Sequence, residues 1–266
     1  MDIASVIGLV LCFALMIFGM LVGQDISVIM GFLHAPSALI TYGGALGCMM
    51  ASCTMPDFIA NLKSIGLIFK MSSMNVPEII QKIIDLSNVA RKEGLLSLEE
   101  AAGEIEDEFL KKGIMLVVDG TDPELVRAIM ETELASVEER HKDKIGFWDG
   151  LGAMGPAWGM IGTLIGLINM LRDLSDFASI GPNMSTALIT TFYGSVLANW
   201  ICAPVASKLK SKNGEEMMVK EIEIEGLLSI QAGENPRVIE EKLKSFLAPG
   251  DRKSSSEDEL GGEMNG

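Results

Sequence analysis

Two threonines in this chain are placed where a hydroxyl group could do chemistry inside a membrane. Thr163 and Thr191 lie within long apolar stretches, where their oxygens could bind an ion or water. If the first stretch runs outward and the second inward, helix rise puts both at nearly the same depth. A lone membrane threonine usually bonds the carbonyl four residues earlier. Two at matched depth therefore predict a shared ion pathway.

Four apolar stretches must position these hydroxyls. Each runs for about twenty residues or more without Asp, Glu, Lys or Arg, which is enough to cross a hydrocarbon core about 30 Å thick. The stretches are residues 3–24, 26–56, 151–171 and 177–207. They predict four transmembrane helices. Because these stretches contain no carboxylate and a single histidine, His34, a chain that conducts ions needs a carboxylate from a partner.

Lysines mark one side of the predicted membrane. They follow the second stretch, precede the third and follow the fourth, whereas Arg172 is the only basic residue in the short outer connections. By the positive-inside rule, both termini and the long middle segment face the cytoplasm. The expected organisation is transmembrane helices 1 and 2 at 1–56, a cytoplasmic helical segment at 57–149, transmembrane helices 3 and 4 at 150–207, a helical cytoplasmic tail at 208–249 and a disordered C-terminus at 250–266.

The segments outside the membrane also read as helices. Val76-Pro77-Glu78 predicts a helix start and Gly94 its end. Ser97 and Glu100 predict a capping box for a second helix that extends to Phe109. Thr121-Asp122-Pro123 predicts a third helix that continues into the third apolar stretch. The fold class is therefore an all-α integral membrane protein with a large helical cytoplasmic segment between spans 2 and 3.

Small residues form a stripe on the third apolar stretch. Gly152, Gly155, Gly159, Gly162 and Gly166 recur at steps of three and four, so they share one helix face. Membrane helices associate through such faces because small residues let backbones approach closely. Five glycines exceed what one helix contact needs, which favours an interface of several helices.

Catalysis and nucleic-acid binding are not indicated. His34 and His141 are far apart in sequence, and the chain has no HExxH, P-loop, GxSxG or paired-cysteine motif. All four cysteines lie in the apolar stretches, where they behave as small apolar residues. The net charge of −15 argues against nucleic acid as a partner. We therefore predict neither an enzyme nor a metal or cofactor site.

Several motifs carry a resemblance to a known family. They are ARKEGLLSLEE, GPAWGMIGTLIGL, ALITTFYG, APVASKL and ENPRVIEEKL. With them the chain resembles the MotA/PomA subunits of the bacterial flagellar stator, within the wider group that includes ExbB and TolQ. The resemblance implies a pentameric ring in the inner membrane around two copies of a MotB-type single-span partner, whose membrane aspartate carries the ion. Ion passage would turn the ring against the rotor protein FliG.

The resemblance also assigns residues. It implies rotor contacts at Arg91 and Glu99, which by helix position also complement helix dipoles. It implies hinges at Pro156 and Pro204, each of which removes a backbone hydrogen bond. Sodium-type members resemble this chain at Thr163, where many proton-type members have alanine, so the coupling ion leans to sodium over the proton.

Two alternatives stay open. One is an ExbB/TolQ-like proton-channel subunit that energises envelope transport. The short outer loop between the first two stretches, the four-span layout and ARKEGLLSLEE argue against it. The other is a membrane scaffold without ion flux.

Overall fold

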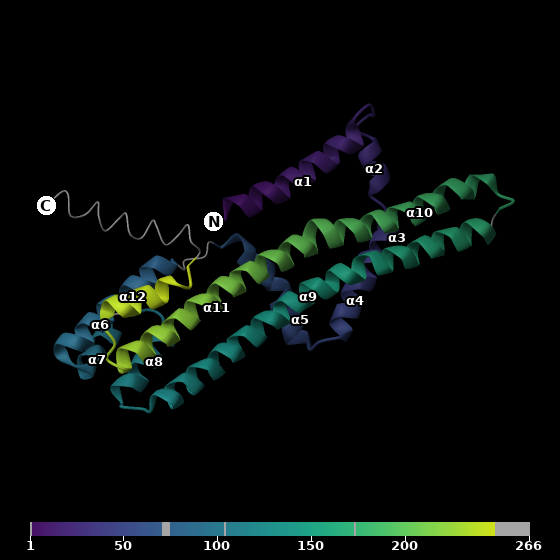
Figure 1. Ribbon diagram of the computed structural model, residues 1–266. Helices are drawn as coiled ribbons and strands as arrows, with labels where there is room; N and C mark the ends of the chain where they lie inside the picture. The colour runs from purple at the N-terminus through teal and green to yellow at the C-terminus, as the bar shows by residue number, and fades with distance from the viewer. Residues whose placement is uncertain (1, 71–74, 104, 173, 248–266) are drawn as a thin grey trace. The chain divides into compact units, whose positions relative to one another are not determined.

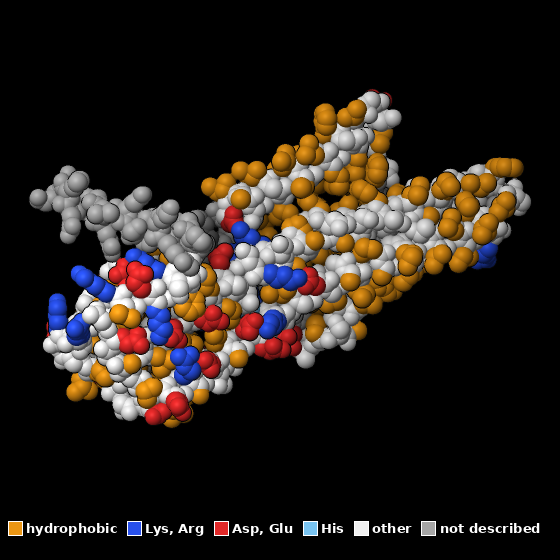
Figure 2. All heavy atoms as spheres, viewed as in Figure 1, with side chains coloured by type: hydrophobic (Ala, Val, Ile, Leu, Met, Phe, Trp, Pro, Cys, Tyr) orange, Lys and Arg blue, Asp and Glu red, His pale blue; other side chains and the backbone are white. Residues whose placement is uncertain are grey.

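The structure, a computed structural model, describes residues 2–70, 75–103, 105–172 and 174–247, and these contain helices and no strand (Figure 1). The chain divides into two compact units, which we describe separately. The apolar unit comprises residues 1–71 and 141–211, and the charged unit comprises 72–140 and 212–266. Figure 2 shows hydrophobic side chains over most of the visible apolar unit and Lys, Arg, Asp and Glu gathered on the charged unit. The predicted disordered C-terminus lies outside the described residues.

The apolar unit consists of helices and short helical turns. Its elements are α1 (Ile3–Leu21), α2 (Val28–Phe32), α3 (Ala35–Ala38), the π-helical turn η1 (Leu39–Gly43), α4 (Gly44–Ala51), α5 (Met55–Lys63), the 3-10 turn η2 (Ser64–Phe69), the later part of α9 (Pro123–Arg172), α10 (Phe177–Val196), the π-helical turn η4 (Leu197–Cys202) and the start of α11 (Ala203–Gln231).

Three helices in the described part of the chain are long and apolar enough to cross a membrane. They are Ile3–Leu21, Pro123–Arg172 and the continuous run Phe177–Gln231. The predicted second span is divided instead: α2 ends at Phe32, and α3 begins at Ala35 behind His34, whose ring accepts a hydrogen bond from the Ser37 amide. Pro36 favours a helix start here, because a first-turn residue needs no amide hydrogen. The four-helix topology therefore stays a prediction.

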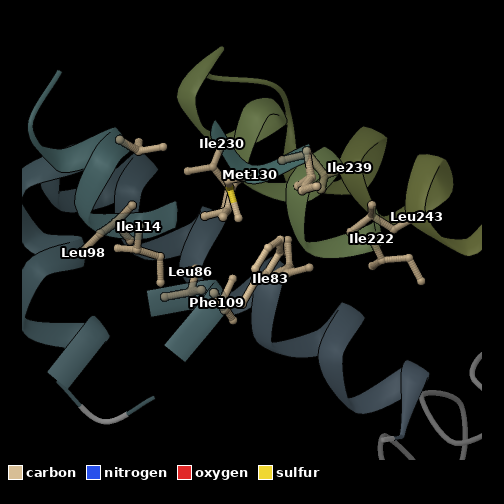
Figure 3. Close-up of a cluster of buried hydrophobic side chains, with 14 of the residues drawn as sticks. Ile83, Leu86, Leu98, Phe109, Ile114, Met130, Ile222, Ile230, Ile239 and Leu243 are labelled. Atoms are coloured by element: carbon tan, nitrogen blue, oxygen red, sulfur yellow. The ribbon is translucent and has the colours of Figure 1, made fainter. Parts of the chain in front are cut away.

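The charged unit has a conventional hydrophobic core. It is built from the start of α9, the end of α11, and α6 (Val76–Glu93), η3 (Leu95–Ser97), α7 (Leu98–Gly103), α8 (Glu108–Val118) and α12 (Pro236–Lys244). Figure 3 shows its side chains converging from these helices. Ile83, Leu98, Ile114 and Ile222 are 0% exposed. At roughly 1.5–3 kcal/mol for each buried aliphatic side chain, this core holds the unit together.

Two helix boundaries in the charged unit are as predicted. α6 begins at Val76 and ends before Gly94, which has a φ of 93° that favours glycine. α9 begins at Pro123 and continues without interruption to Arg172. The Asp122 carboxylate accepts a hydrogen bond of 2.9 Å from the Glu124 amide at this start.

The predicted second helix begins as expected, since α7 starts at Leu98, but it is shorter than predicted. α7 ends at Gly103, and Phe109 belongs to α8 instead. Asp107 starts α8 by accepting hydrogen bonds from the amides of Phe109 (2.8 Å) and Leu110 (3.1 Å). The Ser97 hydroxyl donates to the Gly94 carbonyl at 2.7 Å and so closes the preceding turn. The start of α8 was not predicted, because its cap residue, Asp107, stands next to other acidic residues in the sequence.

Candidate functional site

The glycine stripe of α9 packs against the helix that follows it. Figure 1 shows α9 and α10 side by side. A Cβ on Gly155 would lie 2.8 Å from the Gly194 carbonyl oxygen, and one on Gly159 would lie 2.8 Å from that of Thr190. Both distances are too short for any side chain. At these positions only glycine permits the backbone contact.

The rest of the glycine stripe also packs against α10 and η4, which follow one another in the chain. A Cβ on Gly166 would lie 2.7 Å from the Asn183 carbonyl oxygen, and one on Gly152 would lie 3.1 Å from Cys202 Cβ. Gly162 faces the Thr190 side chain. Within the chain, α10 and η4 thus cover all five glycines, whereas the sequence favoured several helices at this face.

The structure brings Thr163 and Thr191 together. Their hydroxyl oxygens lie 2.5 Å apart, with either as donor. The Thr163 hydroxyl also lies 2.9 Å from the Ala187 carbonyl oxygen. Each threonine also bonds the carbonyl four residues earlier in its own helix, at 3.0 Å for Thr163 and 3.3 Å for Thr191. The result is a cluster of oxygens in otherwise apolar surroundings.

The threonine pair lies at the glycine contact and is open on one side. Thr163 is partly buried and Thr191 is exposed. Met160 and Leu188 each precede one threonine by three residues, on the same helix face, and they are 63% and 65% exposed. The surface around the two hydroxyls is apolar, so it is better suited to pack against another membrane helix than to face water.

Thr190 and Tyr193 were missed by sequence reasoning. The Thr190 carbonyl oxygen accepts a hydrogen bond of 3.3 Å from Thr41, and both threonines are 0% exposed. The Tyr193 ring stacks on Tyr42 with centroids 5.2 Å apart, and its hydroxyl accepts from the His34 amide at 3.1 Å. These contacts hold the divided second apolar stretch against α10. Only the run of two threonines in ALITTFYG gave a signal for them.

The two predicted hinge prolines have different surroundings. Pro156 lies inside α9, where it deprives the Gly152 carbonyl of its helix hydrogen bond. Pro204 is the second residue of α11, which follows η4 directly. π-Helical turns are rare and occur frequently at functional sites. Pro204 also lines a cavity of about 560 Å³ within the apolar unit, together with Asn199 and Trp200.

Arg91 and Glu99 flank an exposed turn of the charged unit. Arg91 lies in the last turn of α6 and Glu99 in the first turn of α7. Both are exposed, and between them Leu96 is 74% exposed. A large apolar side chain between two charges is a common feature of protein-binding surfaces.

The described residues include side chains of the types that serve as ligands for a metal ion. They contain no group of three or more His, Cys, Asp or Glu side chains placed to hold a metal ion. In the charged unit, hydrogen bonds from Lys242 and Arg127 lower the pKa of Glu225. Burial instead raises the pKa of Glu223 to about 8. Neither carboxyl group lies near the threonine pair in sequence.

Comparisons with known proteins agree with this architecture. Residues 101–222 match the model of the MotA/TolQ/ExbB proton channel family. Motility protein A of Treponema pallidum is 42% identical over 95% of this chain and 96% of its own length. The chemotaxis protein PomA of Vibrio alginolyticus is 39% identical over 95% and 98%. In the structure of the flagellar MotAB stator complex from Bacillus subtilis, one chain is 30% identical with a TM-score of 0.87, covering 95% of this chain and 99% of its own.

The similarity covers the glycine stripe, the threonine pair and the charged unit alike, and it extends nearly from end to end of each relative. The two named relatives are motility and chemotaxis proteins, and the solved structure is a flagellar stator. This chain therefore belongs to the MotA/TolQ/ExbB proton channel family, as a MotA-type stator subunit of the bacterial flagellar motor.

Proposed function

We propose that this subunit assembles with a MotB-type single-span partner to form an ion channel, and that ion passage drives torque on the rotor protein FliG. The observation that carries the proposal is the open threonine pair. It offers two hydroxyl oxygens 2.5 Å apart on an exposed apolar face. The partner's helix would cover this face and supply an ionised aspartate.

The missing carboxylate supports the need for a partner. The three candidate spanning helices carry no Asp, Glu, Lys or Arg in the stretches 3–21, 151–171 and 177–207. Intramembrane ion pathways depend on ionisable groups. Hydroxyl and carbonyl oxygens alone can complete the coordination of an ion but cannot balance its charge, so the carboxylate comes from outside this chain.

The oxygen cluster favours sodium over the proton as the coupling ion. Hard cations take several oxygen ligands. The hydroxyl oxygens of Thr163 and Thr191 and the Ala187 carbonyl oxygen form a cluster of three such oxygens, the last two within hydrogen-bond distance of the Thr163 hydroxyl. A proton would need only one relay group.

Replacement of the hydroxyls tests this site. In cells that express the MotB-type partner, Thr163→Val and Thr191→Val should each lower sodium-dependent swimming speed at least several-fold, because valine keeps the shape but removes the oxygen. Thr186→Val is the matched control on α10, since its hydroxyl bonds only the Pro182 carbonyl of its own helix, at 3.0 Å. Unchanged swimming in both variants would refute the proposed site. A protonophore that stops swimming without sodium would identify the proton instead.

The rotor contact is proposed at Arg91 and Glu99, around exposed Leu96. Their exposure leaves both charges available to an oppositely charged partner surface. Arg91→Glu should impair motility and leave membrane insertion and partner binding intact, with Lys82→Glu, also exposed on α6, as the control. If co-purification of the partner is lost with Arg91→Glu, the docking role is wrong.

The remaining proposals concern topology and assembly. We propose four spans with both termini and the charged unit in the cytoplasm, and a ring of five subunits. Pro156 and Pro204 would serve as hinges between ion occupancy and ring movement, and Pro156→Ala should then abolish torque while the ring stays assembled. The motility names of the relatives favour rotation over ExbB/TolQ-like envelope transport.

A further inference from the structure

A cavity in the charged unit is unrelated to the ion pathway or to the turn around Leu96. Its volume is about 800 Å³, and it lies between α6, the connection from α7 to α8, α8 itself and α11. Its walls are partly apolar, with Ile79, Leu86 and Leu110 among them. This is large enough for a small organic molecule.

Carboxyl groups dominate the charge of the cavity. Its lining has a single cationic side chain, Lys82, whose ammonium group is already paired with Glu78 at 3.0 Å. The acidic members of the lining are Glu78, Asp85, Glu106, Asp107 and Glu223. The lining therefore has a clear excess of negative charge and attracts a cation.

Glu223 is the buried member of this group. It is 1% exposed, and its Oε2 atom is buried with no hydrogen-bond partner in the described structure. Two other acidic residues of the lining already accept hydrogen bonds. Asp107 accepts one from the Phe109 amide at the start of α8, and the Asp85 carboxylate accepts one of 3.0 Å from the Gln81 side chain. A buried carboxyl oxygen without a hydrogen-bond partner destabilises the folded state. The presence of Glu223 at this buried position therefore needs an explanation.

We propose that this cavity binds a primary ammonium group on an alkyl stem, with the Glu223 carboxylate as its direct counter-ion. The apolar walls would contact the stem, and the acidic groups at the cavity would favour the positive head. A bare metal ion fits less well, because no three carboxylates of the described residues converge as a metal site.

Binding would release a proton from Glu223. In the empty cavity, burial and the nearby Asp107 raise the pKa of Glu223 to about 8, against a smaller opposing effect of Lys220. The carboxyl group is therefore mainly neutral at pH 7. The ammonium ligand favours the ionised form, so the proton passes to solvent as the ion pair forms.

The pH dependence follows from this exchange. Below pH 8, affinity should rise about tenfold for each pH unit, since each binding event must displace one proton. Above pH 8 it should level off. The charged groups that line the cavity with Glu223 from other elements are Asp107, the cap residue of α8, and Glu78, Lys82 and Asp85 on α6.

Calorimetric titration of the full-length chain in detergent tests the proposal. The probes are putrescine, which represents a free amine, and Nα-acetyl-lysine amide, whose free ε-ammonium group represents a lysine side chain of another protein. At pH 7 the wild type should bind at least one of them and release up to one proton, seen as a heat that varies with the buffer's ionisation enthalpy. The probe that binds more tightly identifies the source of the ammonium group.

Two glutamine variants supply the comparison. Glu223→Gln should weaken binding at least tenfold and abolish proton release. Glu221→Gln, exposed on the same helix, should behave as the wild type. Equal binding by the two variants, binding of neither probe, or a preference for Mg²⁺ over both amines would overturn the proposal. If Glu223→Gln does not fold, a wild-type affinity that stays constant from pH 6 to pH 8 would overturn it equally.

Discussion

Glycines bring helices together in both units, but what they contact differs. In the apolar unit, Gly155 and Gly159 lie against carbonyl oxygens of Gly194 and Thr190. In the charged unit, Gly226 lies against the Ile83 side chain and Gly113 against the ends of the Leu227 and Met130 side chains. Backbone cannot move aside, whereas a side-chain end can rotate.

The difference reflects the two solvents. Lipid is as apolar as a leucine side chain, so membrane helices gain little by burying one and associate instead through close backbone packing. In water, burial of Ile83, Leu98 and Ile114 drives association by itself, and glycine only makes room. The chain thus uses one residue type in two physical roles.

The largest effect is expected from a bulky side chain at the backbone contact. Gly159→Leu would force apart α9 and α10, because the Thr190 carbonyl cannot yield, and we expect loss of the folded chain in detergent by thermal unfolding and size-exclusion chromatography. Gly181→Leu, on α10 with nothing within 4 Å of its Cβ position, should remain folded. Equal stability of the two variants would remove the contrast between backbone and side-chain contacts.

A core truncation in the charged unit should be the next largest. Ile83 is 0% exposed, so Ile83→Ala leaves a cavity and should cost about 3 kcal/mol. Chemical denaturation followed by circular dichroism measures the loss. Val238→Ala, at a site 56% exposed, should change stability by less than about 0.5 kcal/mol. A small loss at Ile83 would show that water-driven burial contributes less than we infer.

The buried carboxyl makes the charged unit sensitive to pH. Because burial raises the pKa of Glu223 from 4.5 to about 8, the folded state holds one more proton than the unfolded state between these values. Stability is fully present below pH 4.5 and is lost as pH rises toward 8, by about 2 kcal/mol between pH 5 and pH 7. Glu223→Gln should remove this slope in ligand-free protein. A slope that persists in the variant would assign it to other groups.

The smallest effect is expected where glycine meets a mobile side chain. Gly113→Ala places a methyl group against the ends of the Leu227 and Met130 side chains, which can rotate, while alanine favours the helix by about 1 kcal/mol over glycine. The net change in unfolding free energy should stay within about 1 kcal/mol. A loss as severe as that from Gly159→Leu would mean that both units pack by backbone contact.

Much of the helical pattern could be predicted locally. The starts at Val76 and Pro123 and the end at Gly94 follow from caps, prolines and glycine, which act within one turn. The second apolar stretch could not be drawn correctly, because its composition allows one long helix and the break at Leu33 and His34 is not marked by polarity. α8 was missed because its cap, Asp107, lies in an acidic run.

The candidate site was predictable in part. Helix rise alone placed Thr163 and Thr191 at one depth, and the structure brings their oxygens to 2.5 Å. The partners of Thr190 and Tyr193 come from residues about 150 positions earlier in the chain. Such contacts have no local signature.

The sequence by itself determined where apolar helices lie, that they lack a carboxylate, and that one face of α9 is made of glycine, since these are properties of residue type and spacing. Only the tertiary structure decided that α10 covers this face and that Thr163 and Thr191 meet beside it, with Thr191 exposed. It alone also decided that Glu223, one of many glutamates, is buried without a partner. Burial and contact depend on what the folded chain brings alongside a residue.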